Sequence, residues 1–589
     1  MQPADANPHH LIFVADPQLV DPHTYPGRPW PLSTFTVKYT DLYMKRVFIR
    51  MQQQLYPDTI FFLGDLFDGG REWATTQSKS PEKRYHKYGD DFWFREYKRF
   101  GNIFFKSWIA SGSVPRPGQP GRRILPTLPG NHDLGFAAGV QKPVRKRFNT
   151  YFGDGNRVDI VANHTFVSID AVSLSAWGAD AGTDDELYKP TLEFLEGAQA
   201  EKKRAMIREL RGQNGLSAAL PYKHGEVGTE NLANDRLPSY DTTEYQNDFP
   251  TILLSHVPLY RAPGTPCGPL REHWPPTPPP KGQTDPVFPD DRNAIAVQAG
   301  YQYQNVLTPD VSRVVTEKIG QVQYAFSGDD HDYCELVHMG YSGAGSGIRE
   351  ITVKSMSWAM GVRRPGFVML SLWNEVDEWG KRKPTSAGTS KKETLQSHLC
   401  LLPDEIGTLI HYGILAGFSL LVLLIRAAVL TALPSRSSYG QEQQYESILP
   451  TSSAEAEKAS DTYDQNHAHS ATASNLSMAS HHNHQLSVRS ATARAKSVSP
   501  GPGGYGLPSL NGGYGLPPQQ TKYSVPLVSH AGYFGTSEDN DAKEAFVSTS
   551  SRTRKPLRGL SLFWAEFTWG LKIVGTPAFG WYFWLVWTG

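Results

Sequence analysis

The sequence predicts an α/β fold whose functional residues gather at one edge of a sheet. The chain opens with a strand–helix–strand pattern, which implies a pair of parallel strands. Five short apolar runs end in Asp, Gln, Asn or His, the residue types that bind divalent cations. Polar groups beyond the carboxyl ends of strands lie where open α/β sheets place their sites. The predicted fold and the predicted site therefore support each other.

The first strand–helix–strand unit covers the first 63 residues. Residues 11–15 and 60–63 are the apolar runs, Thr40 and Asp41 can cap the helix between them, and Pro57 ends it. Helical spacing relates Met44, Phe48, Met51 and Leu55.

Further elements follow in order. A core-facing helix is predicted over 91–110, where aromatic residues recur every three or four positions, and another near 192–210. Later strands are expected at 124–128, 166–170, 251–254, 322–326, 351–354 and 367–372. The domain is predicted to span 1–375, with insertions at about 180–250 and 262–290 and a juxtamembrane linker at 376–405.

The polar segments after the strands supply a complete set of ligands for two metal ions. They are Asp16-Pro17-Gln18, Gly64-Asp65, Gly130-Asn131-His132-Asp133, Ser255-His256 and Gly328-Asp329-Asp330-His331. Each alone reads as a polar turn, but five in series make coincidence a poor explanation. Asp65 is the natural bridging ligand. We expect one ion on Asp16, Gln18 and His331, and the other on Asn131, His256 and Asp329.

Two metal ions so held would activate hydroxide for in-line attack on phosphorus. His132 adjoins a ligand without being one, so it is the candidate general acid that protonates the departing alkoxide. Asp133 is the expected residue to orient its ring.

The order and spacing of these segments resemble the calcineurin-like metallophosphoesterase superfamily, with its D-x-H, G-D-x-x-D, G-N-H-D/E, lone His and G-H-x-H motifs. The match covers residues 11 to about 375 and implies a four-layer α/β/β/α sandwich. Gln18 and Asp329 stand where that family usually has His. Both departures, and the segment Val353-Lys354-Ser355-Met356-Ser357, are similar to the fungal membrane-anchored cell-division-control type, related to the animal GPI-remodelling phosphoesterases.

That resemblance implies a phosphodiesterase that removes ethanolamine phosphate from mannose of GPI anchors, with two divalent ions, here manganese. The extra carboxylate of Asp329 also favours manganese over zinc. The alternatives are a broader-specificity membrane-bound phosphoesterase and a non-catalytic manganese-homeostasis or trafficking factor. Asp330, Asp332 and Asp68 are candidate partners for the substrate ammonium, the alternative being support of the metal ligands. Lys354, Arg363 and Arg364 could meet phosphate or stay solvated.

Composition excludes some functions. The chain has 589 residues, with 58 basic and 58 acidic ones, so nothing in its charge indicates a nucleic-acid partner. Cys267, Cys334 and Cys400 are too few for a disulfide framework or a zinc ribbon. Free thiols are expected, with a single Cys267–Cys334 bridge as the alternative.

The C-terminal third predicts membrane attachment. Residues 406–425 form an apolar run long enough to span a bilayer, 433–558 read as a disordered low-complexity linker, and 560–589 form a second hydrophobic membrane segment. Basic residues flank both apolar runs on the linker side, which places the linker in the cytosol and the catalytic domain in the lumen of the endoplasmic reticulum or early Golgi.

The start of the chain conflicts with that topology. Residues 1–10 are polar and carry no signal peptide, although a lumenal domain needs one. We therefore expect an N-terminal signal-anchor helix that this chain lacks. The glycosylation acceptor Asn163-His164-Thr165 is compatible with a lumenal domain.

Overall fold

The computed structural model describes residues 7–433 and 557–588, with gaps at 118, 120, 179–183, 218–244, 273–276, 286, 288–289, 291, 342–346 and 384–392. Nearly all of the predicted disordered linker 433–558 lies outside the described residues, as does the middle of the predicted insertion 180–250.

Two mixed sheets form the centre of the fold. The first has the order β13-β12-β1-β2-β3 and consists of β1 (His9–Val14), β2 (Thr59–Phe62), β3 (Arg123–Ile124), β12 (Gly366–Leu372) and β13 (Leu395–Leu401). The second has the order β10-β11-β9-β6-β5-β4 and consists of β4 (Arg157–Val161), β5 (His164–Ile169), β6 (Thr251–Ser255), β9 (Val322–Ser327), β10 (Cys334–His338) and β11 (Ile348–Thr352). The central pairs β1–β2 and β6–β9 are both parallel. A small hairpin, β7 (Ala299–Gly300) and β8 (Tyr303–Gln304), forms a separate two-stranded sheet, and the carbonyl of Gln302 in its turn accepts from the Asn131 side-chain amide at 3.0 Å.

Aromatic side chains join the two sheets face to face. Phe13 of β1 packs against Phe166 of β5 and Phe326 of β9, with ring centroids 6.4 and 4.5 Å apart. Phe61 of β2 stacks on Phe166 at 5.2 Å. Because side chains alternate along a strand, the neighbours of these residues point to the outer faces of the sandwich.

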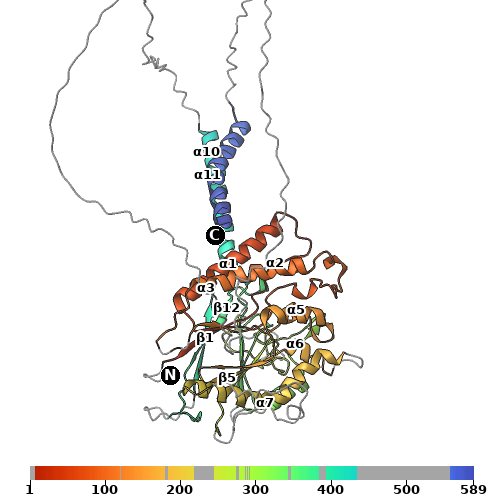
Figure 1. Cartoon of the computed structure of the whole chain (residues 1–589). Helices are drawn as coiled ribbons and strands as arrows, with labels where there is room; N and C mark the ends of the chain where they lie inside the picture. Colours follow the sequence, from red (N-terminus) through yellow and green to blue (C-terminus); the bar gives the residue numbers. More distant parts are fainter. Residues whose placement is uncertain are drawn as a thin grey trace, which may run out of the picture. The chain divides into compact units, whose positions relative to one another are not determined.

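Helices cover those outer faces (Figure 1). On the first sheet, Phe62 packs against Phe100 at the end of α2 (Asp90–Phe100) and Phe104 in the wider turn before α3 (Lys106–Ala110), and α1 (Leu32–Leu55) adds Phe48. On the second sheet lie α7 (Asp185–Gln213) and α9 (Pro309–Ile319). The predicted α/β/β/α sandwich is confirmed. Shorter helices are α4 (Asn131–Leu134), α5 (Lys142–Phe152) and α6 (Ala171–Leu174).

The first helix begins eight residues before the predicted cap. Thr40 lies inside α1, where its hydroxyl donates to the carbonyl of Thr36 at 3.0 Å instead of capping the helix. The helix follows Pro31 directly.

Two strands also differ from the prediction. The expected strand 124–128 is reduced to β3, because Pro126 lacks the N–H that a ladder requires, although Leu125 and Leu128 still donate to carbonyls of β2. The predicted domain end at 375 and linker 376–405 are wrong in part, because β13 pairs with β12 along its whole length.

The C-terminal helices are α10 (Glu405–Ala432) and α11 (Leu560–Thr588). Among the described helices, α10 alone is long and apolar enough to cross a membrane, with a mean hydropathy of 2.3 and few buried residues. Arg426 of α10 pairs with Glu566 of α11 at 3.3 Å and lies over the ring of Trp569. Near its other end, Phe583 of α11 contacts Phe35 of α1 at 5.3 Å. The predicted span 406–425 lies within α10.

Candidate metal centre

The predicted ligands follow the central strands of both sheets. Asp16 and Asp65 lie just beyond β1 and β2 in one sheet, and His256 and Asp329 lie just beyond β6 and β9 in the other. All four strands run parallel to a neighbour of this group, so their carboxyl ends meet at one edge of the sandwich.

The backbone at these positions is unusual. Five expected metal residues are left-handed, with positive φ at Asp16 (46°), Gln18 (27°), Asp65 (52°), Asp329 (70°) and His331 (66°). Non-glycine residues in this region cost about 1–3 kcal/mol each and cluster at functional sites. The chain therefore bends sharply at each strand end to turn these side chains toward one point.

His256 lies at the centre of the cluster. Its Nδ1 donates to the carbonyl of Leu63 at 2.8 Å, which leaves Nε2 as the lone-pair nitrogen. That Nε2 lies 3.4 Å from Asp65 Oδ1, 3.6 Å from Asp329 Oδ1 and 3.2 Å from Asn131 Oδ1. Burial lowers the pKa of His256, but the surrounding carboxylates outweigh it and hold that pKa well above its usual range. The carboxylates of Asp65 and Asp329 therefore lie around the fully buried imidazole of His256.

The remaining ligands converge on the same point. Donor atoms of Asp16, Asp65 and His256 all lie within 4.8 Å of one another. Burial raises the pKa of Asp16 to about 7, against the opposing charges of His331 and His256. The structure thus brings together all seven predicted ligands: Asp16, Gln18, Asp65, Asn131, His256, Asp329 and His331.

The chemistry of these donors fits divalent metal ions. Within the described residues, Asp16 Oδ2 and Gln18 Oε1 are buried and have no hydrogen-bond partner. Nδ1 of His331 faces the carbonyl of Met360 at 3.1 Å, which leaves its other nitrogen available to bind a metal. Three carboxylates with neutral oxygen and imidazole donors suit hard or borderline cations. Glycine is required here, because a Cβ on Gly130 would overlap the Asp65 carboxylate.

His132 stands beside the ligands, as predicted. Its backbone N–H donates to Asp65 Oδ1 at 2.8 Å, and its Nδ1 donates to the Asp68 carbonyl at 2.6 Å. No described residue hydrogen-bonds its Nε2. Burial and the charge of Arg71 lower the pKa of His132, which makes the imidazolium a stronger acid.

Asp133 does not orient His132, contrary to the prediction. Its carboxylate accepts backbone N–H groups of Gly130, Leu66 and Phe67 at 3.0–3.2 Å, and burial raises its pKa to about 7. It fixes the two ligand loops to each other. The carboxylate beside His132 is Asp68, whose Oδ1 lies 3.3 Å from Nδ1 of that ring.

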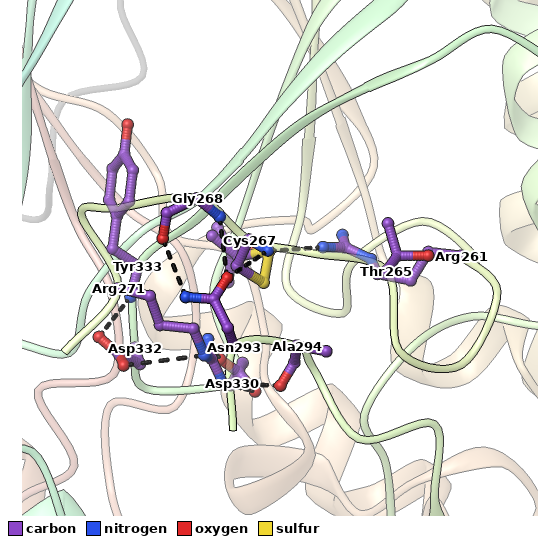
Figure 2. Close-up of a disulfide and its surroundings, with 12 residues drawn as sticks. Arg261, Thr265, Cys267, Gly268, Arg271, Asn293, Ala294, Asp330, Asp332 and Tyr333 are labelled. Carbon is purple, nitrogen blue, oxygen red and sulfur yellow. Dashed lines mark hydrogen bonds and ion pairs between the residues drawn. A yellow bond between two sulfur atoms is a disulfide. The ribbon is translucent and has the colours of Figure 1, made fainter. Parts of the chain in front are cut away.

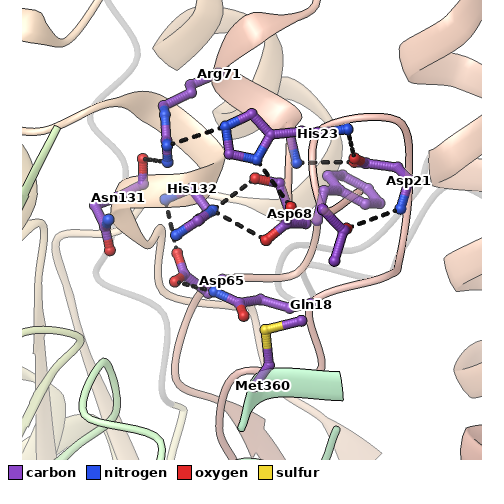
Figure 3. A network of polar contacts seen from close by, with 12 residues as sticks. Gln18, Asp21, His23, Asp65, Asp68, Arg71, Asn131, His132 and Met360 are labelled. Carbon is purple, nitrogen blue, oxygen red and sulfur yellow. Dashed lines mark hydrogen bonds and ion pairs between the residues drawn. The ribbon is translucent and has the colours of Figure 1, made fainter. Parts of the chain in front are cut away.

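Sequence reasoning missed His23 and Arg71, which join this network (Figure 3). His23 Nδ1 lies 2.8 Å from Asp68 Oδ2, and Arg71 donates to the carbonyl of Asn131 at 3.0 Å. Although burial alone would raise it, the hydrogen bond from His23 and the charge of His132 lower the pKa of Asp68 to about 2. The sequence signal that could have indicated His23 is its position, five residues after Gln18 in the first metal segment.

The residues proposed to recognise an ammonium group are already paired. Asp330 accepts from Arg271 at 2.6 Å, Asp332 accepts from Lys354 at 2.6 Å, and Asp68 pairs with His23. These contacts favour the alternative role of the three carboxylates, which is to support the metal ligands. Lys354 is buried in its pairs, so it is not free for phosphate, whereas Arg363 is mostly exposed and pairs with Asp404 through Nε.

A buried disulfide joins Cys267 to Cys334, which overturns the expectation of free thiols (Figure 2). The bridge ties the loop that carries Arg271 to the start of β10, just after the ligand segment 329–331. Asn293 braces the same loop, since its Oδ1 accepts the backbone N–H groups of Cys267 and Gly268. Cys400 is free.

Comparisons with known proteins identify relatives of this chain. Cell division control protein 1 of Saccharomyces cerevisiae is 33% identical over 404 residues, which are 68% of this chain and 62% of that protein. The chain therefore spans just under two thirds of the yeast relative. Metallophosphoesterase 1 of Cricetulus griseus is 27% identical over 397 residues, 67% of this chain and 74% of that protein.

No protein-family model matches the chain. A dimetal phosphatase structure from Danio rerio is 13% identical and covers 62% of this chain and 94% of that chain, with a TM-score of 0.28, too low to support an argument about fold. The two sequence relatives carry the conclusion. The chain is a homologue of yeast Cell division control protein 1 and of the metallophosphoesterase 1 proteins.

Proposed function

We propose that the chain is a metal-dependent phosphodiesterase that removes ethanolamine phosphate from mannose of GPI anchors. One observation carries the hydrolase assignment: seven metal-binding side chains converge beside His132, whose Nε2 has no partner among the described residues. Kinship with metallophosphoesterase 1 supports it. The particular substrate, manganese as the metal and a lumenal membrane location extend this assignment and rest on the resemblance drawn from the sequence.

The residues divide the work. One divalent ion would be held by Asp16, Gln18 and His331. The other would be held by Asn131, His256 and Asp329, and both ions would share Asp65. When bound, the ions supply Lewis acidity and an activated water for in-line attack on phosphorus. His132 Nε2 gives its proton to the leaving alkoxide as the P–O bond breaks, and Asp68 holds the imidazolium in place.

A cavity of about 750 Å³ begins at Val20 and Asp21, shortly after the candidate ligand Gln18, and offers room for the rest of a large substrate. Asp21, in its wall, accepts the backbone N–H of His23, so the cavity adjoins the loop next to the general acid. Aromatic rings such as Tyr25 and Tyr88 and the cations Arg28 and Arg95 also line it. Such a surface suits sugars and phosphate groups.

Two features support a membrane enzyme of the secretory pathway. The helix α10 is long and apolar enough to span a bilayer. The Cys267–Cys334 disulfide is of the kind that persists in oxidising compartments such as the endoplasmic-reticulum lumen.

The full chain, purified in detergent with manganese, tests the proposal. A GPI glycan bearing ethanolamine phosphate would be offered, and released ethanolamine phosphate measured by mass spectrometry. We expect release by wild type and by the control His86→Ala, an exposed histidine, but not by His132→Ala. Hydrolysis of a generic phosphodiester with an intact glycan would favour the broader-specificity enzyme. Turnover of neither substrate with two metals bound would favour the non-catalytic role.

A further inference from the structure

We infer that His23 is a positioning residue for the general acid His132, acting through Asp68. This inference rests on the proposed phosphodiesterase function and adds a residue that the metal motifs do not contain. His23 belongs to the loop that follows Gln18, and its side chain is 18% exposed. Its ring stands edge-on to that of His132, with centroids 5.7 Å apart.

The two imidazoles hold one carboxylate between them. His23 Nδ1 lies 2.8 Å from Asp68 Oδ2, and His132 Nδ1, which donates to the Asp68 backbone carbonyl at 2.6 Å, also lies 3.3 Å from Asp68 Oδ1. Asp68 is 7% exposed, so water has little access to either oxygen. The contact from His23 holds Oδ2, which leaves Oδ1 on the side of His132.

The far side of His23 fixes which nitrogen carries the proton. Arg71 Nη2 lies 3.5 Å from His23 Nε2, and a guanidinium can only donate. Nε2 must therefore accept, which places the proton on Nδ1, where it is donated to Asp68. Arg71 also donates to the carbonyl of Asn131, the residue before His132, so the network closes on itself (Figure 3).

The loop itself is clamped to the segment that carries Asp68. Asp21 accepts the backbone N–H of His23 at 2.7 Å through one oxygen and that of Gly69 at 2.8 Å through the other. The ring of Tyr85 packs against His23 at 5.5 Å. His23 thus has a fixed backbone, a fixed ring and a fixed tautomer.

A third metal ion is the competing role for His23, Asp68 and His132, because their donor atoms lie within 4.8 Å of one another. The guanidinium of Arg71 at His23 argues against a cation there. The hydrogen-bond directions also match an orienting chain, with each nitrogen that faces Asp68 acting as a donor.

The arrangement of His23 and Asp68 affects the transfer of one proton, the proton on His132 Nε2. As the P–O bond breaks, its electron pair stays on the alkoxide oxygen, which takes the proton from His132 Nε2, and His132 becomes neutral. Asp68 aligns that Nε2 with the leaving oxygen, and His23 aligns Asp68. His23 neither gains nor loses a proton in the step.

The test compares leaving groups that need an acid with those that do not. We would assay the full chain with a dialkyl phosphodiester and with methyl p-nitrophenyl phosphate, whose nitrophenolate departs unaided. His23→Ala is expected to lower kcat on the dialkyl substrate by about 10- to 100-fold, and on the nitrophenyl substrate by less than about 3-fold. His23→Asn, whose amide can donate from nearly the same place, should recover most of the loss. Bound metal should stay at the wild-type level in both variants.

Three outcomes would overturn the inference: equal losses on both substrates, no loss on either, or a loss of one equivalent of metal in His23→Ala. The variant His132→Ala keeps this failure separate from that of the proposed function. If His132→Ala loses only the dialkyl activity while His23→Ala behaves as wild type, the general acid stands and the positioning role fails. If His132→Ala loses neither activity, the proposed mechanism itself fails.

Discussion

The side-chain amide of Gln18 donates to Oδ2 of Asp65 at 2.8 Å. This bond orients the amide so that its oxygen, buried and without a hydrogen-bond partner in the described part of the chain, faces the metal centre. In the proposed metal centre, Gln18 would be a neutral oxygen ligand that also orients the carboxylate of Asp65. A histidine at this place could offer a nitrogen to the metal but would lack that fixed amide donor.

Replacing Gln18 by Leu should cost one metal ion. The variant loses the oxygen ligand and the donor to Asp65 together, so we expect about half the wild-type metal content after dialysis and a loss of activity of about 100-fold. Elemental analysis of the purified chain measures the first effect. Gln18→His, which restores a ligand, should regain metal. Two bound equivalents in Gln18→Leu would show that Gln18 is not a ligand.

Removing Arg271 should destabilise the loop over the ligand segment. Both Arg271 and Asp330 are more than nine-tenths buried, so Arg271→Met leaves an uncompensated carboxylate at a cost of about 3–5 kcal/mol. Thermal unfolding measures it, and Asp330→Asn added to Arg271→Met should recover part of the loss. If the double variant is no more stable than Arg271→Met, the pair is not coupled.

Loss of the Cys267–Cys334 disulfide should lower the stability of the domain by an amount similar to that expected for Arg271→Met. The bridge closes a loop of 67 residues, for which chain entropy predicts about 4 kcal/mol. We expect Cys267→Ser with Cys334→Ser to lower the unfolding temperature, and the control Cys400→Ser to leave it nearly unchanged. Peptide mapping without reductant should recover the linked pair from wild type. Recovery of both cysteines as free thiols from membranes would contradict the structure.

The stability of the domain should fall in mild acid because of His164. Burial lowers its pKa to about 4, while Nδ1 donates to the carbonyl of Ala162 and Nε2 accepts from the Thr394 hydroxyl. In the unfolded chain its pKa is about 6.5. Between those values only the unfolded state binds the proton, so stability declines as pH falls from about 6.5 to about 4, by up to about 3 kcal/mol.

Unfolding temperatures across that range, measured with chelator present to remove metal effects, test this prediction. His164→Gln cannot take the proton, so its stability should decline less steeply than that of wild type. Parallel curves for the two proteins would mean that another group dominates.

Asn163 should carry no glycan, although it begins an acceptor triplet. Its Nδ2 donates to the carbonyl of Asn374, its Oδ1 accepts from Gln213, and Thr165 is buried in β5. A sugar on Nδ2 would displace the first of these bonds. Glycosidase treatment is expected to leave the mass of the peptide unchanged. A glycan on Asn163 would show that modification precedes folding of the β4–β5 hairpin. If Asn163 is unmodified, the disulfide is the feature from which the compartment of the domain must be inferred.

The sequence predicted the layers and the place where the candidate ligands gather, because both depend on local patterns. Apolar runs that end in Asp16, Asp65 or His256 mark strand ends, and parallel strands bring such ends together. The candidate general acid His132 followed from its place beside Asn131.

What could not be predicted depends on distant parts of the chain. The carboxylate beside His132 is Asp68 rather than the neighbouring Asp133, since tertiary packing turns Asp133 toward the backbone of Leu66 and Phe67. The pairing of Cys267 with Cys334 and the place of β13 are likewise settled by segments that meet only in the folded chain. Left-handed backbone at Asp329 and Asp65 gives no signal in composition, because neither residue is a glycine.

The start of α10 is fixed to the catalytic domain rather than hung from a flexible stalk. The Tyr39 hydroxyl donates to Glu405, the Tyr43 hydroxyl to the Pro403 carbonyl, and Arg363 pairs with Asp404. If α10 spans a bilayer, these contacts restrict the motion of the domain relative to the helix and therefore relative to the lipid surface. A substrate anchored in the same bilayer would then meet the centre by diffusion in two dimensions.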